Sequence, residues 1–188
     1  GEAFDLEKIG KSGARFNIDK GTWFNQQYLI ATPDAQLAKM VRPIIEAQGH
    51  QPSDAFLEEF VGLMKERVTR LPEFWDKGYY FFDKVKEYEQ KPIKKKWKPN
   101  MRPHFDALVE VLKNIEPFDA PTVETKVKAF IQDNELRMGD ILQIFRVAIS
   151  GTLKGPDVFK MAALLGKTEV LERFKLGYTY FDELKAVS

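Results

Sequence analysis

The stretch TPDAQLAKMVRPIIEAQG, residues 32–49, decides the class of the fold. Thr32 followed by Pro33 is typical of a helix start, because proline fits the first helical position, where its missing N–H costs no hydrogen bond. Apolar side chains then recur every three or four residues along one helical face, and Gly49 ends the pattern. The face consists of Leu37, Met40, Val41, Ile44 and Ile45. The stretch therefore predicts an amphipathic helix.

The same periodicity extends along nearly the whole chain, and no alternating strand pattern exceeds a few residues. Ser53 is a candidate N-cap for the next helix, and later helical patterns begin near His104, Thr122, Met138 and Pro156. The sequence predicts an all-α fold built from two helical subdomains in series.

The boundary between the subdomains is expected where the composition changes. Residues 85–103, VKEYEQKPIKKKWKPNMRP, are polar, basic and interrupted by prolines. Such a segment is typical of a linker or a poorly packed junction. We therefore expect one subdomain over residues 1–95 and a second over residues 96–188.

The composition excludes several kinds of site. The chain of 188 residues has no cysteine and only His50 and His104, which rules out disulfides and disfavours histidine catalysis or a metal cluster. No apolar run approaches the roughly 18 residues of a membrane span, and the first residues do not resemble a signal peptide. We expect a cytoplasmic protein that does not bind a membrane. Because the chain starts at Gly1 without methionine, we also expect a fragment of a larger protein.

A net charge of +1 disfavours a nonspecific nucleic-acid binder, and no DNA partner is expected. RNA binding would therefore need a local patch or specific base contacts. The candidate patch surrounds Trp97 and consists of Lys91, Lys94, Lys95, Lys96, Lys98 and Arg102. Within it, the candidate phosphate contacts are Lys94, Lys95, Lys96 and Lys98. These lysines either contact phosphates or form a solvated hinge, and both interpretations stay open. For Trp97 we favour packing in the protein over stacking on a base.

Arg67 is a second candidate, because it falls on the apolar stripe predicted for the helix that starts at Ser53. Phe60, Leu63 and Met64 define that stripe. A charged group on an apolar face needs a partner. Periodicity alone favours an ion pair or a place at the helix C-terminus. The functional alternative is an arginine held in place so that its guanidinium contacts a base edge.

The third candidate is RVAISGTLKGPDVF, residues 146–159. A helix is predicted to end at Ser150–Gly151, and Pro156 is predicted to start the next one. A short connection of this kind exposes backbone amides that suit anions or base edges. Arg146 lies one turn upstream, off the apolar stripe. An ordinary turn with a solvated arginine explains the pattern equally well.

No catalytic motif is present. G-x-S-x-G, H-E-x-x-H and G-x-G-x-x-G are all missing from the sequence. Lys8–Ser12, KIGKS, is no phosphate-binding loop, because Asp5 stands where that loop requires glycine. The residues therefore predict a binding module with no catalytic residues, no bound metal and no cofactor. A helical protein–protein interaction module without RNA specificity is the alternative.

Three phrases of the chain nevertheless resemble the C-terminal anticodon-binding domain of bacterial class I glutamyl-tRNA synthetases. They are FDLEKIGKSGARFNIDKGTWFNQQYL (residues 4–29), LMKERVTRLPEF (63–74) and FRVAISGTLKGPDVFKMAALLGKTEVLERF (145–174). The resemblance implies an α-helical cage and a monomer that binds the anticodon loop of tRNA-Glu. It places Lys11–Ser12 in the connection into this domain. The ATP- and Mg²⁺-dependent chemistry belongs to a catalytic region that the chain does not match.

The resemblance also implies roles for individual residues. Arg67, or else Arg70, would contact the third anticodon base, which is C in tRNA-Glu and G in tRNA-Gln. Arg146 would contact the anticodon loop. The first anticodon base would lie in a cradle to which Thr152 is a weaker candidate contributor. The members of that cradle are Gly155, Pro156 and Val158; at Gly155 some relatives carry threonine.

Overall fold

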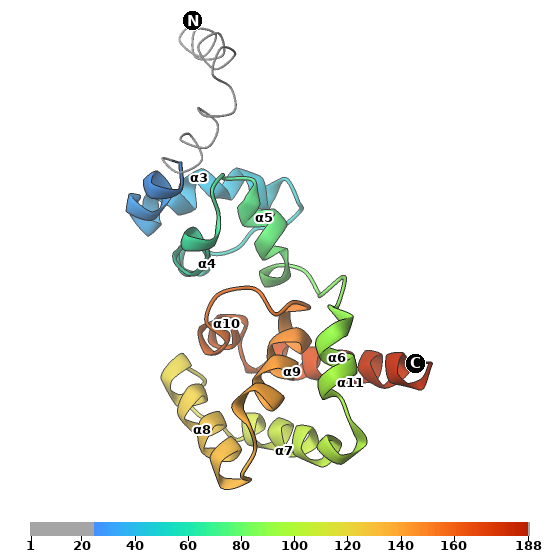
Figure 1. Ribbon diagram of the computed structural model, residues 1–188. Coiled ribbons are helices and arrows are strands. Elements are labelled where there is room, and N and C mark those ends of the chain that lie inside the picture. Colours follow the sequence, from blue (N-terminus) through green and yellow to red (C-terminus); the bar gives the residue numbers. More distant parts are fainter. Residues whose placement is uncertain (1–24, 188) are drawn as a thin grey trace, which may run out of the picture. The chain divides into compact units, whose positions relative to one another are not determined.

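The computed structural model describes residues 25–187, and every regular element among them is helical (Figure 1). The all-α class is therefore confirmed for this part of the chain. The KIGKS stretch at residues 8–12 lies outside the described residues.

The chain divides into two compact units, Gly1–Gly78 and Tyr79–Ser188. The division thus comes earlier than the boundary expected between residues 95 and 96. The physical reason is that residues 90–96 are not a linker. They form helix α6 (Gln90–Lys96), which buries Pro92 and Ile93 and packs against α9 (Met138–Ser150) inside the second unit. The basic composition misled the prediction, because it describes only the outer face of α6.

In the first unit, α3 (Asp34–Glu46) and α4 (Asp54–Met64) pack side by side and bury their apolar faces against each other. Ser53 caps the second of them as predicted, since its hydroxyl accepts from the Phe56 amide at 3.1 Å. The Thr32 side chain does not cap the N-terminus of α3. Its buried hydroxyl instead donates to the Tyr28 carbonyl at 2.6 Å, in the preceding helical segment. The elements are a helical segment at 25–31, α3 (Asp34–Glu46), α4 (Asp54–Met64), η1 (Lys65–Arg67) and α5 (Glu73–Gly78).

In the second unit, α9 is the central helix. It contacts α6 on one side and α8 (Ala120–Asp133) and α10 (Val158–Leu165) on another, and it packs along α11 (Lys167–Ala186) (Figure 1). Gly177 of α11 faces Ala148 of α9, and a Cβ there would make an ordinary van der Waals contact with it at 3.4 Å. The other elements are η2 (Tyr79–Phe81), η3 (Pro99–Met101) and α7 (Arg102–Lys113).

Trp97 belongs to the core of the second unit, with 5% of its surface exposed. Its ring stacks on Phe105 at 4.9 Å and meets Tyr178 at 4.7 Å, while its Nε1 donates to Asp182 at 2.9 Å. Burial by itself would raise the pKa of Asp182, but hydrogen bonds from Arg102 and Trp97 outweigh it and hold that pKa below its usual range. The packing interpretation of Trp97 is therefore confirmed.

The longest helix of the described part, α11, has 20 residues and carries many charged side chains. None of the helices within residues 25–187 combines the length and the apolar composition that a membrane span requires.

Candidate nucleic-acid interface

The connection between α9 and α10, residues 151–157, begins at a position that only glycine can fill. Gly151 ends α9 in the left-handed conformation, with φ +83°, and its amide donates to the Val147 carbonyl at 2.7 Å. A Cβ at Gly151 would lie 2.2 Å from the Glu87 carbonyl oxygen and 2.7 Å from Val85. The backbone of the segment before α6 thus touches the connection where it leaves α9.

Ser150 and Thr152 stabilise the next part of the connection. The buried Ser150 hydroxyl lies 2.7 Å from the Arg146 carbonyl and 3.0 Å from the Thr152 carbonyl, so that it can donate to either one. The Thr152 hydroxyl donates to the Glu89 carboxylate and accepts from the Lys154 amide at 3.1 Å. The connection is therefore an ordered turn, although it has no regular secondary structure.

Arg146 of α9 reaches from the helix to the far end of the connection. It is half-buried, and its Nη1 donates to the Pro156 carbonyl at 2.7 Å. Gly155 allows this approach, because its φ is +140° and a Cβ there would lie 3.3 Å from the same nitrogen. A side chain at Gly155 would therefore strain the backbone and crowd Arg146.

The start of α10 is capped by Asp157. Its Oδ1 accepts from the amides of Phe159 and Lys160, both at 2.9 Å, so the helix begins at Val158 and not at the predicted Pro156. Pro156 and Val158 are buried, whereas Leu153 and Lys154 are exposed. Asp157 is exposed as well, so the exposed side chains of the connection all belong to residues that the sequence analysis did not select.

Arg67 differs from its expected place. Helix α4 ends at Met64, and the tighter turn η1 carries Arg67 away from the apolar stripe, so that its side chain is exposed. No acidic side chain among the described residues pairs with it, and its backbone carbonyl accepts from the Lys77 ammonium at 3.2 Å. The buried stripe consists of Leu57, Phe60, Val61, Met64 and Val68, with Leu63 only partly covered.

Arg70 is exposed as well, on a backbone that is held by its neighbours. The Glu73 carboxylate accepts from the Thr69 amide at 2.7 Å and from the Thr69 hydroxyl at 3.0 Å. Burial by itself would raise the pKa of Glu73, but these bonds and the charge of Lys77 outweigh it and leave that pKa below its usual range. The turn that carries Arg67 and Arg70 is therefore fixed at its far end.

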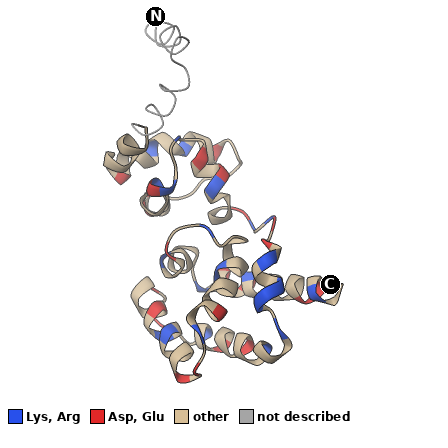
Figure 2. Cartoon of the chain, in the orientation of Figure 1, with Lys and Arg blue, Asp and Glu red and all other residues tan. Residues whose placement is uncertain are grey.

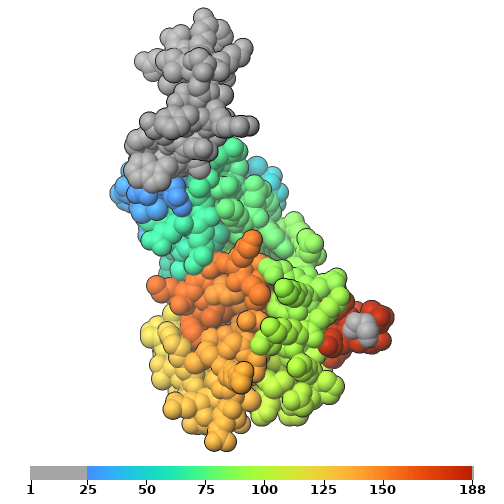
Figure 3. Space-filling model, viewed as in Figure 1, coloured from blue at the N-terminus to red at the C-terminus, as the bar shows by residue number. Residues whose placement is uncertain are grey.

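The candidate lysines separate into two groups on α6 and just after it (Figure 2). Lys94, Lys95 and Lys98 are exposed, and no acidic side chain in the described part of the chain pairs with them. Lys96 instead forms a salt bridge with Asp140 of α9 at 2.7 Å. Figure 3 shows the yellow-green α6 region and the orange α9 region side by side on the surface of this unit.

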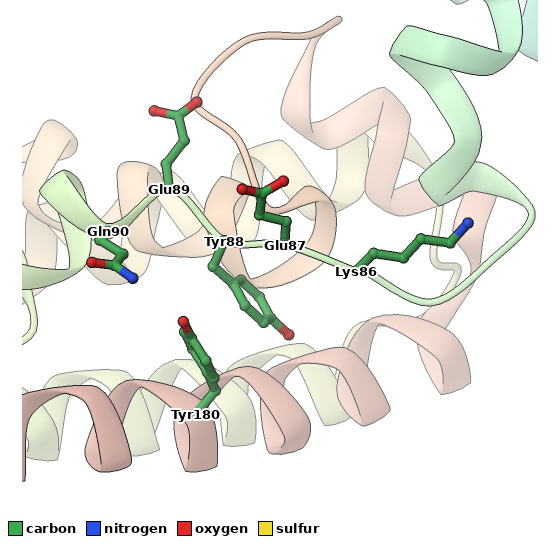
Figure 4. Close-up of a pocket in the computed structure, with 6 residues that line it drawn as sticks. All are labelled: Lys86, Glu87, Tyr88, Glu89, Gln90 and Tyr180. Atoms are coloured by element: carbon green, nitrogen blue, oxygen red, sulfur yellow. The ribbon is translucent and has the colours of Figure 1, made fainter.

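A pocket of about 450 Å³ lies beside this surface, between residues 86–90 and α11 (Figure 4). Tyr88 stacks on Tyr180 inside it, with ring centroids 4.7 Å apart. Burial is the main cause that raises the pKa of Tyr88 above its usual value. Glu89 also lines the pocket, but its carboxylate points toward the connection at residues 151–157 (Figure 4).

A buried arginine, which the sequence analysis missed, ties this region together. Arg173 of α11 is 4% exposed and donates to Glu169 at 2.8 Å, to the Ile149 carbonyl at 2.6 Å and to the Asp83 carbonyl at 3.0 Å. It therefore links α11, the last turn of α9 and the segment before α6. The sequence offered one signal for it, because Arg173 falls on the same helix face as Val170, Phe174 and Gly177.

The structure thus brings most candidate residues into one unit. Arg146 and the residues of the connection belong to the second unit, and so do Lys94, Lys95 and Lys96 of α6 and Lys98 just after it. Arg67 belongs to the other unit. Within residues 25–187, His, Asp and Glu side chains nowhere gather in groups of three or more that could hold a metal ion.

Comparison with known families finds one family model that matches most of the chain. The family model described as "Anticodon binding domain" matches residues 36–178. The match covers parts of both units and includes Arg67, Arg146 and the whole connection at residues 151–157.

Comparison with curated proteins agrees. The glutamate–tRNA ligase of Parabacteroides distasonis is 38% identical over 172 residues, which are 92% of this chain and 34% of that protein. The glutamate–tRNA ligase of Flavobacterium johnsoniae is 40% identical over 174 residues, or 93% of this chain and 34% of that protein. The chain therefore spans about a third of the length of these relatives.

Solved structures show the same likeness. A crystal structure of a glutamate tRNA ligase from Elizabethkingia meningosepticum, in complex with its amino acid, superposes with a TM-score of 0.78 at 28% identity. The superposition covers 83% of this chain and 31% of that one. The glutamate–tRNA synthetase of Elizabethkingia anophelis gives a TM-score of 0.72 at 26% identity, over 83% and 30% of the two chains.

Proposed function

The chain belongs to the anticodon-binding domain family, and from this premise we propose that it recognises the anticodon loop of tRNA-Glu as part of a glutamate–tRNA ligase. The observation that carries the proposal is the family match over residues 36–178, which takes in Arg67, Arg146 and the connection at 151–157. The relatives named as glutamate–tRNA ligases supply the identity of the tRNA.

The complete ligase would activate glutamate with ATP and Mg²⁺ and join it to the 3′ end of the tRNA in the cytoplasm. No residue of this chain is assigned to that chemistry. The chain would contribute binding free energy and selectivity, through contacts to phosphates that position the RNA and contacts to bases that identify it.

Arg67 is proposed to contact the third anticodon base. Its guanidinium carries only donors, and the Watson–Crick edge of cytosine offers the acceptors O2 and N3. The same edge of guanine has one acceptor, O6, beside N–H donors that a guanidinium cannot accept from, and guanine is larger. The exposure of Arg67 and the lack of an acidic partner among the described residues leave its donors available. Arg67 would therefore favour the C of tRNA-Glu over the G of tRNA-Gln.

The connection at 151–157 is proposed to meet the first anticodon base. Unstacked bases of an RNA loop present their edges and faces to protein side chains and backbone groups. Leu153 and Lys154 are exposed, and Gly155 keeps the backbone accessible. Pro156 and Val158 are buried and would support the connection without touching the base. Arg146 would hold the connection in place through its bond to the Pro156 carbonyl.

The lysines of α6 are proposed to contact phosphates. Lys94, Lys95 and Lys98 supply charge that no described acidic side chain neutralises, whereas Lys96 is engaged with Asp140. Such contacts strengthen binding to every RNA sequence and make it depend on salt.

Titration with two RNA stem-loops tests the proposal. The stem-loops differ only at the third anticodon base, C or G, and each is titrated with the 188-residue chain at about 50 and 200 mM salt. We expect one chain per RNA, tighter binding to the C form, and weaker binding to both forms at the higher salt. Equal binding of both forms would remove the role of Arg67, and no binding of either would favour the protein–protein module.

A further inference from the structure

We infer that Glu89 is a positioning residue that sets the shape of the connection at residues 151–157. What the connection binds rests on the proposed function; that Glu89 orders the connection rests on the structure alone. Glu89 is 63 residues away in sequence from Thr152 and 64 residues away from Leu153, the two residues that its carboxylate binds.

The contacts of Glu89 are concentrated on three successive residues. Its amide donates to the Gly151 carbonyl at 2.8 Å. Its Oε1 accepts from the Thr152 hydroxyl and, at 3.0 Å, from the Leu153 amide. Figure 4 shows the side chain directed toward the connection and away from the tyrosine pair. Backbone and side chain of Glu89 thus bind the same short turn.

Thr152 extends this control by one more residue. Because its hydroxyl donates to Glu89, the oxygen lone pairs are free to accept, and the Lys154 amide donates to them at 3.1 Å. One carboxylate oxygen therefore orders the backbone as far as Lys154. Leu153 and Lys154, two of the exposed residues of the connection, are the ones whose amides are fixed in this way.

The charge of Glu89 argues that it does not bind RNA directly. An exposed carboxylate repels phosphates, so its presence beside a proposed RNA surface costs affinity unless it contributes in another way. A neutral acceptor would perform the ordering equally well, because the two bonds need only an oxygen lone pair. This separates the role of the acceptor from the effect of the charge.

Three variants of the full chain make that separation. Glu89→Gln keeps the acceptor and removes the charge, whereas Glu89→Ala removes both. Glu87→Ala is the matched control, because it deletes a neighbouring exposed carboxylate whose side chain makes no hydrogen bond among those in the described residues. The readouts are NMR hydrogen exchange at the Leu153 and Lys154 amides and the Kd for the C-form stem-loop.

We expect Glu89→Ala to speed exchange at the Leu153 amide about five- to tenfold, since one hydrogen bond of ordinary strength is lost. Its Kd should rise about three- to tenfold above that of Glu87→Ala. Glu89→Gln should stay within about twofold of the unaltered chain in both readouts.

Unchanged exchange in Glu89→Ala would overturn the inference, and so would a Glu89→Gln variant that behaves like Glu89→Ala. Faster exchange with an unaltered Kd would overturn the link to RNA binding. If the unaltered chain binds neither stem-loop, the proposed function fails, while the exchange comparison still decides whether Glu89 orders the connection.

Discussion

At the scale of single residues, Arg67 and Arg70 are both exposed, so exposure leaves both of them available to bind RNA. They lie on either side of the buried Val68, and the intervening backbone is anchored where Thr69 donates to Glu73. Both guanidinium groups reach solvent from a stable turn. Their substitution should therefore change binding without changing the fold.

Arg67→Ala is expected to cost about 1–3 kcal/mol of binding to the C-form stem-loop and to remove most of the preference for C over G. The melting temperature should not move, because the side chain is exposed. Arg70→Ala is the matched control and should keep the preference. The measurement is the ratio of the two Kd values for each variant. A preference that disappears with Arg70 and survives without Arg67 would exchange their roles.

At the scale of the elements, two features shape the proposed RNA surface: the left-handed end of α9 and the basic face of α6. Each depends on residues that tolerate substitution differently from their neighbours. Gly151 has no room for a Cβ, and Lys96 has a partner that Lys94, Lys95 and Lys98 lack among the described residues.

Gly151→Ala should lower the free energy of unfolding by at least about 1–3 kcal/mol, because alanine is strained at φ +83° and its Cβ would clash with Glu87. Gly139→Ala, at the opposite end of the same helix, is the control. Its nearest neighbour would be Gln143 at 3.9 Å, so stability should stay equal or rise slightly. Urea unfolding of both variants gives the comparison. Equal stability of Gly151→Ala and the unaltered chain would show that Val85 and Glu87 can move away from the added Cβ at little cost in free energy.

Replacing Lys94, Lys95 and Lys98 together with glutamine should weaken binding of the C and G stem-loops by the same factor and make binding depend less on salt. Lys96→Gln should instead reduce stability slightly, since it leaves Asp140 without its salt bridge. The salt dependence of log Kd for each variant is the measurement. An unchanged slope in the triple variant would identify α6 as a solvated face without RNA contacts.

At the scale of the whole molecule, the proposed contacts are divided between two units. Arg67 belongs to the first, and Arg146, the connection and the α6 lysines belong to the second. Within the second unit, Arg173 joins three segments that are far apart in sequence. The contact between these three segments therefore depends in part on the buried Arg173.

Arg173→Met should lower the free energy of unfolding by about 2–4 kcal/mol, because the carbonyls of Ile149 and Asp83 lose their donor and methionine offers none. Arg137→Met makes the same chemical change at an exposed position and should have an effect below about 0.5 kcal/mol. Chemical unfolding followed by circular dichroism compares them. Equal stability of the two variants would mean that water replaces the guanidinium at no cost.

The sequence by itself determined the all-α class, because helical periodicity depends on neighbours three and four residues apart and needs no tertiary information. The resemblance to the anticodon-binding family was also visible in the sequence, because residues 4–29, 63–74 and 145–174 are each similar to segments of that family. Among local details, the Ser53 cap and the helix end at Gly151 were predictable for the same reason.

Only the tertiary structure decided the rest. The division at Gly78, the exposure of Arg67 and the pairing of Lys96 with Asp140 depend on which segments pack together. The contacts of Glu89 and Arg173 join groups that are 24 to 90 residues apart, and no local pattern announces such pairs. Burial and hydrogen bonding are satisfied in space and not along the chain, so the shape of the proposed RNA surface could come only from the fold.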